Sequence, residues 1–288
     1  MMDKKTAFLI SPSAYSGTDS LKNAKEILRS WNFNIKYLPD ITSKYYYYAG
    51  DYKRRANEIN NAYKDKDSKY IFTILGGMGS VQTLPYLDYN LIKKTDKVLI
   101  GFSDVTILLN TIFQKTGAKC IHGPNLNKSL KEFDEKTISC LFDVLKKKNY
   151  NVSFEEEDVI VSGTVKGSIV GGNLCLLERS LGTDFEVNTT NKIIFIEDVR
   201  MKEGWVFDIL WQLKLAGKFD NVKGIILGHF VDCGDNIEQY LRDFFKDFKC
   251  PVIMNQPIGH KEPNFSIPFG EICIIDTNKK FWKIQFKN

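Results

Sequence analysis

One stretch of the sequence constrains the fold more than any other: an apolar run that ends in a serine and leads straight into a second apolar segment. Residues 98–102 form an apolar run between polar neighbours, which predicts a buried parallel strand. Ser103 follows at once, and residues 105–113 predict a buried helix. A serine at such a junction lies on a tight turn, beside the free N–H groups of the helix start. The pattern is typical of a nucleophile elbow, although a serine that only caps the helix produces it too.

The rest of the first half alternates between strand-like and helix-like segments. Apolar runs predict strands at residues 6–10, 33–38, 70–75 and 118–121, and helical spacing predicts helices at 21–31, 51–66 and 135–147. This alternation predicts a doubly wound parallel sheet, in which sites form outside the carboxyl ends of the strands. The loop Gly76-Gly-Met-Gly-Ser80 follows one of these strands, and its glycines let the backbone approach a ligand closely. The loop and Ser103 therefore fall at the same edge of the predicted sheet.

The second half is predicted to form a separate domain. Residues 146–165 are rich in charged and polar side chains, so we assign residues 1–148 to an N-terminal domain, 149–165 to a linker and 166–288 to a C-terminal domain. Strands are expected at residues 159–165, 192–196, 222–227, 271–275 and 281–286, and helices at 205–217 and 236–247. Residues 167–174 are rich in glycine and predict a turn that leads into a helix ending near Leu181.

Composition excludes several classes of function. The net charge of +5 is modest and the lysines are scattered among acids, so no nucleic-acid-binding face is expected. The sequence contains no apolar run long enough for a transmembrane helix, and its start lacks the apolar core of a signal peptide, so we expect a cytoplasmic protein. The six cysteines are widely separated and show no C-x-x-C spacing, which favours free thiols over a zinc site.

Any histidine-dependent chemistry of this chain must use one of three residues: His122, His229 or His260. A serine hydroxyl needs a base that titrates near neutral pH, and histidine is such a base. His260 follows a glycine in a predicted loop, His122 follows a strand and is a rival, and His229 is a weaker candidate. Glu197 comes directly after four apolar strand residues, and a carboxylate there can fix the tautomer of an imidazole. The order serine, acid, histidine also occurs in serine hydrolases, but spacing does not choose among the histidines, and a structural role stays open for Glu197 and His260.

Six short motifs, taken together and in order, resemble the LD-carboxypeptidase family of serine peptidases, which also includes the microcin C immunity peptidases. The motifs are Gly76-Gly-Met-Gly-Ser80 with Leu84-Pro-Tyr-Leu-Asp88, Gly101-Phe-Ser-Asp104, His122-Gly-Pro124, Gly171-Gly-Asn-Leu174, Phe195-Ile-Glu-Asp-Val199, and Pro257-Ile-Gly-His260 with Ile267-Pro-Phe-Gly270. The resemblance spans about residues 6–285, nearly the whole chain. It implies an α/β fold with an N-terminal Rossmann-like parallel-sheet domain and a smaller C-terminal β-rich α/β domain.

The resemblance also implies a role for each matching site residue. Ser103 is the expected nucleophile, His260 the general base and Glu197 the acid that orients the base. The backbone N–H groups of Gly77 and Asp104 are expected to form the oxyanion hole. The implied reaction is hydrolysis of the amide between an L-configured centre and a terminal D-amino acid, as in the removal of D-alanine from murein tetrapeptides.

The same resemblance implies the ligands and partners. Gly76 and Met78 are expected to contact the substrate, which is a small peptide or a peptidyl-nucleotide. Neither a metal ion nor a cofactor is required. Family members are often dimers, so a homodimer is expected by analogy, with no nucleic-acid or membrane partner.

The glycine loop departs from the usual family pattern, which is Arg-Gly-Gly-Tyr-Gly. Here the loop is Leu75-Gly-Gly-Met-Gly79, which favours the immunity-peptidase branch, whose members cleave aminoacyl-nucleotide conjugates. His122-Gly-Pro124 resembles the carboxypeptidase branch instead, and murein tetrapeptide is the substrate that we favour. An alternative of another class is a non-catalytic nucleotide-binding Rossmann protein, in which the glycine loop holds a phosphate and Ser103 caps a helix.

Overall fold

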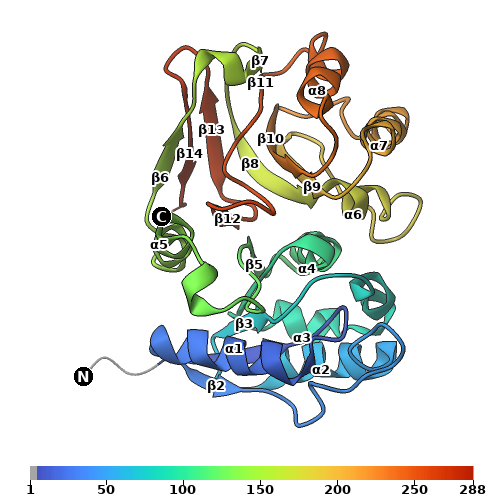
Figure 1. The fold of residues 1–288 in the computed structure, drawn as a ribbon, viewed down its shortest axis with the longest axis vertical. Coiled ribbons are helices and arrows are strands. Elements are labelled where there is room, and N and C mark those ends of the chain that lie inside the picture. The colour runs from blue at the N-terminus through green and yellow to red at the C-terminus, as the bar shows by residue number, and fades with distance from the viewer. Residues whose placement is uncertain (1–4, 288) are drawn as a thin grey trace. The chain divides into compact units, whose positions relative to one another are not determined.

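The computed structural model describes residues 5–287, and the chain divides into two compact units that meet in the sequence at Asp134 and Glu135 (Figure 1). This division falls earlier than the linker expected at residues 149–165, whose boundaries stay a prediction. Among the described residues, no helix is long and apolar enough to cross a membrane.

The first unit is built on a parallel sheet. Its strands are β1 (Thr6–Ile10), β2 (Asn34–Lys36), β3 (Tyr70–Thr73), β4 (Val98–Gly101) and β5 (Lys119–His122). They lie in the order β5-β4-β3-β1-β2, and every pairing among them is parallel. The predicted parallel sheet is therefore confirmed, and the direction of the strand order reverses between β1 and β3, where such sheets bind ligands.

The helices of the first unit connect these strands. They are α1 (Gly17–Ser30), α2 (Tyr52–Lys64), α3 (Tyr89–Lys93), α4 (Thr106–Thr116) and the 3-10 helices η1 (Ser80–Tyr86), η2 (Ser103–Val105) and η3 (Leu130–Glu132). The chain moves outward from β1 to β2 and then returns past β1 to β3, so right-handed crossovers place α1 and α2 on opposite faces of the sheet. Burial explains the apolar runs, because all residues of β3 and β4 are buried and most of α4 is buried too.

The second unit is built on a mixed sheet in the order β6-β14-β13-β8-β9-β10-β11-β7. Its strands are β6 (Tyr150–Ser153), β7 (Val159–Val161), β8 (Thr164–Asn173), β9 (Lys192–Val199), β10 (Gly224–Val231), β11 (Val252–Ile253), β13 (Ile272–Asp276) and β14 (Phe281–Gln285), and the short β12 (Ile267–Pro268) lies between β11 and β13 in the sequence. The pairings from β8 through β11 are parallel, and the others in this sheet are antiparallel. The second unit is therefore β-rich, as the resemblance implies.

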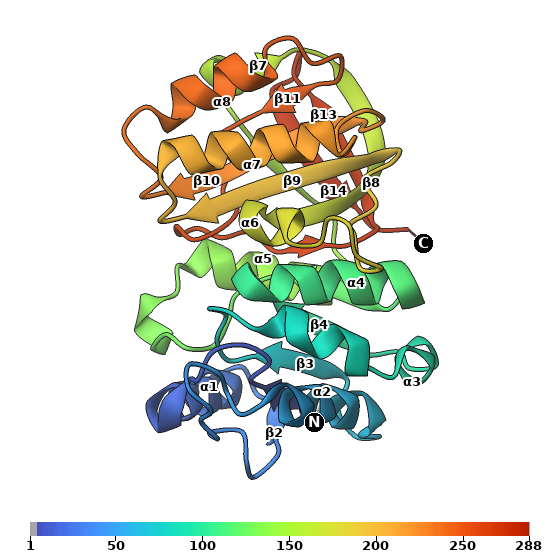
Figure 2. The ribbon, with the colours of Figure 1, turned by 90° about the vertical axis from the view of Figure 1, so that its right-hand side faces the viewer.

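Helices precede or connect the strands of the second unit. They are α5 (Glu135–Leu145), α6 (Leu174–Glu178), α7 (Glu203–Leu215), α8 (Ile237–Phe245) and the 3-10 helix η4 (Glu156–Asp158). Figures 1 and 2 show α6, α7 and α8 together on the same side of β9 and β10. Because α5 and β6 belong to it, the second unit is the longer of the two by this division.

Residues 167–173 form part of a strand, which corrects the glycine-rich turn predicted there. They belong to β8, which pairs antiparallel with β13 and parallel with β9. Gly171 has a φ of +143°, and a Cβ atom there would lie 2.0 Å from the carbonyl oxygen of Phe195 in β9. The glycines thus allow a close approach of two strand backbones. The predicted helix is reduced to α6, which ends at Glu178.

Candidate active site

Ser103 lies at the turn between β4 and α4, as its sequence pattern predicts. Its backbone has a φ of +65°, in the left-handed region that residues with a side chain rarely adopt. Ser103 is the first residue of η2, whose N-cap is Phe102, and the N-cap of α4 is Val105. Ser103 therefore does not hold the N-cap position that the capping alternative requires. Its strained backbone is typical of a nucleophile elbow.

Buried polar side chains hold the residue that precedes Ser103. The Oδ1 of Asn125 accepts a hydrogen bond from the N–H of Phe102, and its Nδ2 donates to the Phe102 carbonyl, each at 3.4 Å. The hydroxyl of Thr73 donates to the same Oδ1 at 2.5 Å. These bonds fix the main chain from which the strained turn departs. Nothing in the sequence points to Asn125 as a site residue except its place directly after Pro124 of the His-Gly-Pro motif.

The glycine loop, residues 76–80, lies directly against Ser103. A Cβ atom at Gly76 would lie 3.0 Å from the Cβ of Ser103 and 3.2 Å from its Oγ. Gly77 and Gly79 have φ angles of +99° and +118°, which L residues rarely adopt. Glycine at position 76 thus keeps the space beside the serine hydroxyl free of a side chain.

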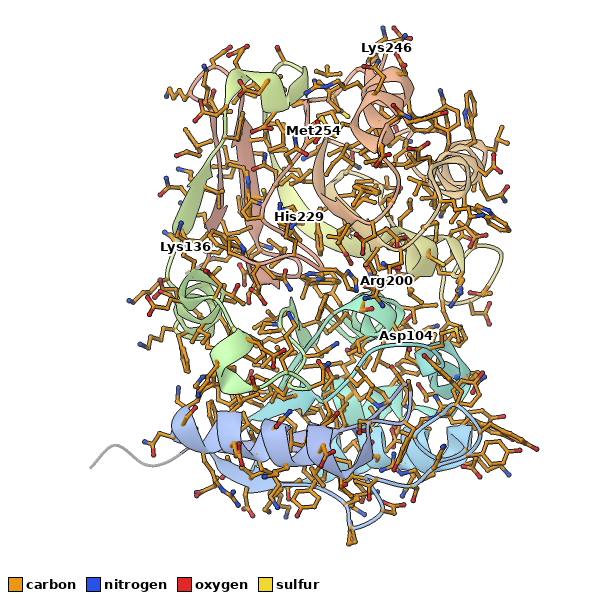
Figure 3. The ribbon with its side chains drawn as sticks, viewed as in Figure 1. Asp104, Lys136, Arg200, His229, Lys246 and Met254 are labelled. Carbon is orange, nitrogen blue, oxygen red and sulfur yellow. The ribbon has the colours of Figure 1, made fainter. Side chains whose placement is uncertain are left out.

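The carboxylate of Asp104, labelled in Figure 3, connects the turn to the end of the glycine loop. It is buried, and its Oδ2 accepts a hydrogen bond from the N–H of Ser80 at 2.8 Å. The hydroxyl of Ser80 donates in return to the carbonyl of Asp104 at 2.6 Å. Among the described residues, the other carboxylate oxygen, Oδ1, has no hydrogen-bond partner. The reciprocal bonds hold the loop and the Ser103 turn together as one piece of the first unit.

Glu197 and His260 form a hydrogen-bonded pair in the second unit. Glu197 lies within β9 with its side chain fully buried, and its Oε2 lies 2.6 Å from Nδ1 of His260. The side chain of His260 is 17% exposed, so part of the ring is accessible. With the carboxylate ionised, Nδ1 carries the proton and Nε2 is the basic nitrogen of the ring.

The loop that carries this histidine is fixed by its neighbours. Gly259 has a φ of +115°, and a Cβ atom there would lie 2.8 Å from Oε2 of Glu197. The N–H of Gly259 donates to Oδ1 of Asn264 at 2.9 Å, and the N–H of His229 donates to the carbonyl of Ile258 at 2.8 Å. A glycine next to the histidine therefore lets the loop pack directly onto the buried acid.

A second buried carboxyl group adjoins Glu197. Asp198 accepts hydrogen bonds from the side-chain amide of Asn173 at 3.0 Å, from the N–H of Cys175 at 3.0 Å and from the N–H of Val199 at 2.7 Å. Burial first, and then the neighbouring charge of Glu197, raise the pKa of Asp198 to about 6, against the effect of these hydrogen bonds. Its one signal in the sequence is its place beside Glu197 at the end of the apolar run.

The two other histidines have different surroundings. His122 ends β5 and is fully buried, with its ring edge-on to Phe102 at 5.6 Å between ring centres. His229 lies within β10 (Figure 3), although the strand predicted here ends at residue 227, because β10 continues to Val231. Burial lowers the pKa of His229. His260 is thus the histidine whose ring contacts the predicted acid.

The residues of the predicted triad belong to different units. Ser103 and the glycine loop are in the first, and Glu197 and His260 are in the second. Within each unit the structure brings the predicted residues together, Gly76 to Ser103 and Glu197 to His260. Among residues 5–287, no group of three or more His, Cys, Asp or Glu side chains is arranged to hold a metal ion.

Comparison with known proteins identifies the family. The model of the LD-carboxypeptidase N-terminal domain matches residues 8–123, and the model of the LD-carboxypeptidase C-terminal domain matches residues 166–275. The chain belongs to the LD-carboxypeptidase family. It is therefore a member of a family of serine hydrolases, as the sequence motifs predict. This membership argues against the non-catalytic nucleotide-binding alternative.

Both branches of the LD-carboxypeptidase family occur among the relatives. The probable murein peptide carboxypeptidase of Bacillus subtilis is 28% identical over 293 residues, which cover 96% of this chain and 90% of that protein. The microcin C7 self-immunity protein MccF of Escherichia coli is 30% identical over 271 residues, which cover 82% of this chain and 79% of that protein. A structure of MccF in complex with glutamyl sulfamoyl guanosine matches with a TM-score of 0.90 at 27% identity, covering 100% of this chain and 97% of that one.

Proposed function

We propose that this chain is a serine carboxypeptidase that hydrolyses the amide between an L-configured centre and a terminal D-amino acid. Ser103 is the nucleophile, His260 the general base and Glu197 the acid that orients it. The observation that carries the proposal is the 2.6 Å contact between Oε2 of Glu197 and Nδ1 of His260. This contact makes Nε2 the nitrogen that accepts a proton, which is the state that a serine nucleophile requires.

The proposed reaction has two halves. Ser103 Oγ attacks the scissile carbonyl while Nε2 of His260 takes the hydroxyl proton, and the resulting imidazolium then protonates the leaving amine of the D-amino acid. Water next attacks the acyl-enzyme, again with His260 as base, and releases the acid product and the free serine. The charge of Glu197 stabilises the imidazolium in both halves.

The negative oxygen of each tetrahedral intermediate needs hydrogen-bond donors. We assign this role to the backbone N–H groups of Gly77 and Asp104, each of which lowers the barrier by on the order of 3 kcal/mol. Asp104 directly follows the nucleophile, which is the usual place of one donor in a nucleophile elbow. Gly76 and the exposed side chain of Met78 are the proposed substrate contacts on the same loop.

For the substrate we favour a murein tetrapeptide, from which the enzyme releases D-alanine. Support comes from the murein peptide carboxypeptidase of Bacillus subtilis, 90% of which is covered by the match, and from the His122-Gly-Pro124 motif. A second candidate is an immunity-type peptidase that cleaves aminoacyl-nucleotide conjugates, favoured by the TM-score of 0.90 to MccF and by Met78 in the glycine loop. We further propose a cytoplasmic homodimer, by analogy with the family.

One mass-spectrometric assay separates the two substrates. The purified chain is offered a murein tetrapeptide and an aminoacyl sulfamoyl adenosine side by side, and the expected result is release of D-alanine with slower or no cleavage of the conjugate. Ser103→Ala is the control and should lower turnover by at least about 10⁴-fold while the chain stays folded. Preferential cleavage of the conjugate would support the immunity-type peptidase instead of the murein carboxypeptidase. Full turnover by Ser103→Ala would refute the triad.

A further inference from the structure

A fully buried arginine, Arg55, donates a hydrogen bond to the glycine loop. The side chain of Arg55, on α2, has no exposed surface, and burial of a guanidinium is costly unless its donors are satisfied. Burial lowers the pKa of Arg55, while the charge of Asp104 raises it. The chain therefore retains a buried cation at a place where an apolar residue would be easier to accommodate, and its contacts indicate why.

The donors of Arg55 are directed at three separate loops. Nη1 donates to the carbonyl of Gly79 at 2.6 Å and to the carbonyl of Pro12 at 2.9 Å, and Nε donates to the carbonyl of Gly50 at 3.3 Å. Nη2 donates to Oε1 of Gln82 at 2.6 Å. Pro12 follows β1 and Gly79 follows β3, so the guanidinium joins the loops that leave the sheet where the strand order reverses.

The bond to Gly79 fixes the loop at its strained end. Gly79 has a φ of +118°, and a Cβ atom there would lie 2.8 Å from Nη1 of Arg55. A hydrogen bond from a charged donor stabilises by about 1.5–3 kcal/mol, enough to select one loop conformation among several. The next residue, Ser80, is held from the opposite side by the carboxylate of Asp104. Arg55 and Asp104 thus form hydrogen bonds with adjacent residues of the glycine loop, Gly79 and Ser80.

We propose that Arg55 is a positioning residue, which holds the glycine loop so that the N–H of Gly77 is aimed at the developing oxyanion beside Ser103. The inference rests on the proposed function, because that function assigns Gly77 to the oxyanion hole. Arg55 touches neither substrate nor nucleophile in this role and acts only through Gly79. Its effect is therefore on the chemical step, since the oxyanion forms only in the transition state.

Lysine cannot replace Arg55 in this position. The guanidinium presents its donors in a fixed planar fork, which allows one side chain to reach three loops at once, whereas an ammonium is a single point on a flexible stem. Arg55→Lys thus keeps the charge and removes the geometry. Arg55→Gln removes the charge and keeps one donor group, so it tests the same contact without a buried cation.

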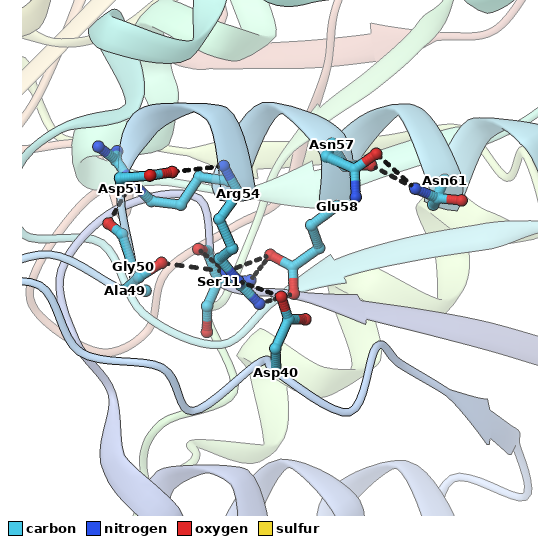
Figure 4. Close-up of polar contacts among 10 residues, drawn as sticks. Ser11, Asp40, Ala49, Gly50, Asp51, Arg54, Asn57, Glu58 and Asn61 are labelled. Atoms are coloured by element: carbon cyan, nitrogen blue, oxygen red, sulfur yellow. Dashed lines mark hydrogen bonds and ion pairs between the residues drawn. The ribbon is translucent and has the colours of Figure 1, made fainter.

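The neighbouring Arg54 is a matched control. It also lies on α2, and it donates to Glu58 at 2.6 and 3.2 Å and to the carbonyl of Ala49 at 3.1 Å (Figure 4). Its remaining contacts are with the carbonyl of Ser11 and the carboxylate of Asp40. None of these partners belongs to the glycine loop. Arg54→Lys therefore disturbs a comparable set of bonds on the same helix without releasing Gly79.

The experiment measures kcat, KM and the melting temperature of wild type, Arg55→Lys, Arg55→Gln and Arg54→Lys with the substrate that wild type cleaves. We expect both Arg55 variants to lose about 10- to 100-fold in kcat with KM nearly unchanged, as for a small misplacement of a catalytic group. Arg54→Lys should lower the melting temperature by about as much as the Arg55 variants do, because it loses a comparable set of hydrogen bonds. It should keep kcat within about threefold of wild type. The rate at which a fluorophosphonate labels Ser103 should fall in parallel with kcat, because the phosphonyl oxygen uses the same donors.

The outcomes separate this inference from the proposed function. Suppose that wild type turns over its substrate normally. An unchanged kcat in the Arg55 variants would then overturn the positioning role alone, and so would a kcat loss in Arg54→Lys equal to theirs. A wild-type chain that neither cleaves a substrate nor reacts with the fluorophosphonate would overturn the proposed function, and this inference with it.

Discussion

The two units hold their candidate catalytic groups in different ways. In the first, main-chain geometry does so: Ser103 has a φ of +65°, and the loop beside it depends on glycines that keep side chains away. In the second, a side-chain contact does so, because Glu197 and His260 are joined by one hydrogen bond of 2.6 Å. An added side-chain atom should therefore lower kcat most in the glycine loop of the first unit. Removal of a side-chain functional group should lower kcat most in the second unit.

The largest expected effect sharpens the side-chain half of this comparison. His260→Ala should lower kcat by about 10⁴-fold or more, because it removes the proposed base and leaves the nucleophile without activation. His122→Ala should change kcat by less than about tenfold, since His122 is a fully buried residue at the end of β5. Steady-state kinetics of the two variants decide the assignment. A larger loss in His122→Ala would move the base to the first unit.

The next effect tests the main-chain half. Gly76→Ala adds one methyl group 3.0 Å from the Cβ and 3.2 Å from the Oγ of Ser103, and it should lower kcat by about 100-fold. The matched control is Gly204→Ala in α7, where a Cβ atom would meet nothing within 4 Å. That variant should keep kcat and raise the free energy of unfolding by about 0.5–1 kcal/mol, as glycine-to-alanine changes in helices do. Equal kcat in the two variants would show that the space beside Ser103 tolerates a methyl group at position 76.

The same contrast explains which parts of the molecule the sequence predicts. The strands of the first unit are recognisable because burial on both faces requires uninterrupted apolar runs, as in β3 and β4. Ser103 is recognisable because strand, serine and helix are adjacent in the sequence. Local main-chain features of this kind are encoded by neighbouring residues, so a pattern reveals them.

Features that depend on distant residues are not predictable in this way. Glu197 and His260 lie 63 positions apart, so no spacing rule selects this histidine over the other two. The glycines of β8 are typical of a turn, and only the approach of β9 to within 2.0 Å of a Cβ at Gly171 explains why they form a strand. Arg55 follows Lys53 and Arg54 in a charged helix, a pattern that indicates an exposed face, yet it is fully buried.

Each unit also buries a carboxyl group with a raised pKa, which provides a comparison in stability. Burial raises the pKa of Glu58 to about 7 in the first unit and that of Asp198 to about 6 in the second. A carboxyl with a raised pKa binds its proton more tightly in the folded chain than in the unfolded one. The stability that each of these two groups contributes is therefore fully present below its unfolded pKa and is lost as pH rises through its folded pKa. The expected window is about pH 4 to 6 for Asp198 and about pH 4.5 to 7 for Glu58.

The smallest expected effect is the pH dependence of stability, and Asp198→Asn measures it. In wild type this titration lowers the free energy of unfolding between pH 4 and pH 7. In Asp198→Asn that fall should be smaller by on the order of 3 kcal/mol, as measured by urea denaturation at both pH values. Glu58→Gln should reduce the same loss by a similar amount without changing kcat, since Glu58 bonds to Ser11 and Arg54 and not to the glycine loop. Asp198 adjoins the acid of the proposed triad, so its variant should also alter the acid side of the pH–rate profile. If the two variants changed that profile equally, Asp198 would be a stability group like Glu58, and its place beside Glu197 would have no catalytic consequence.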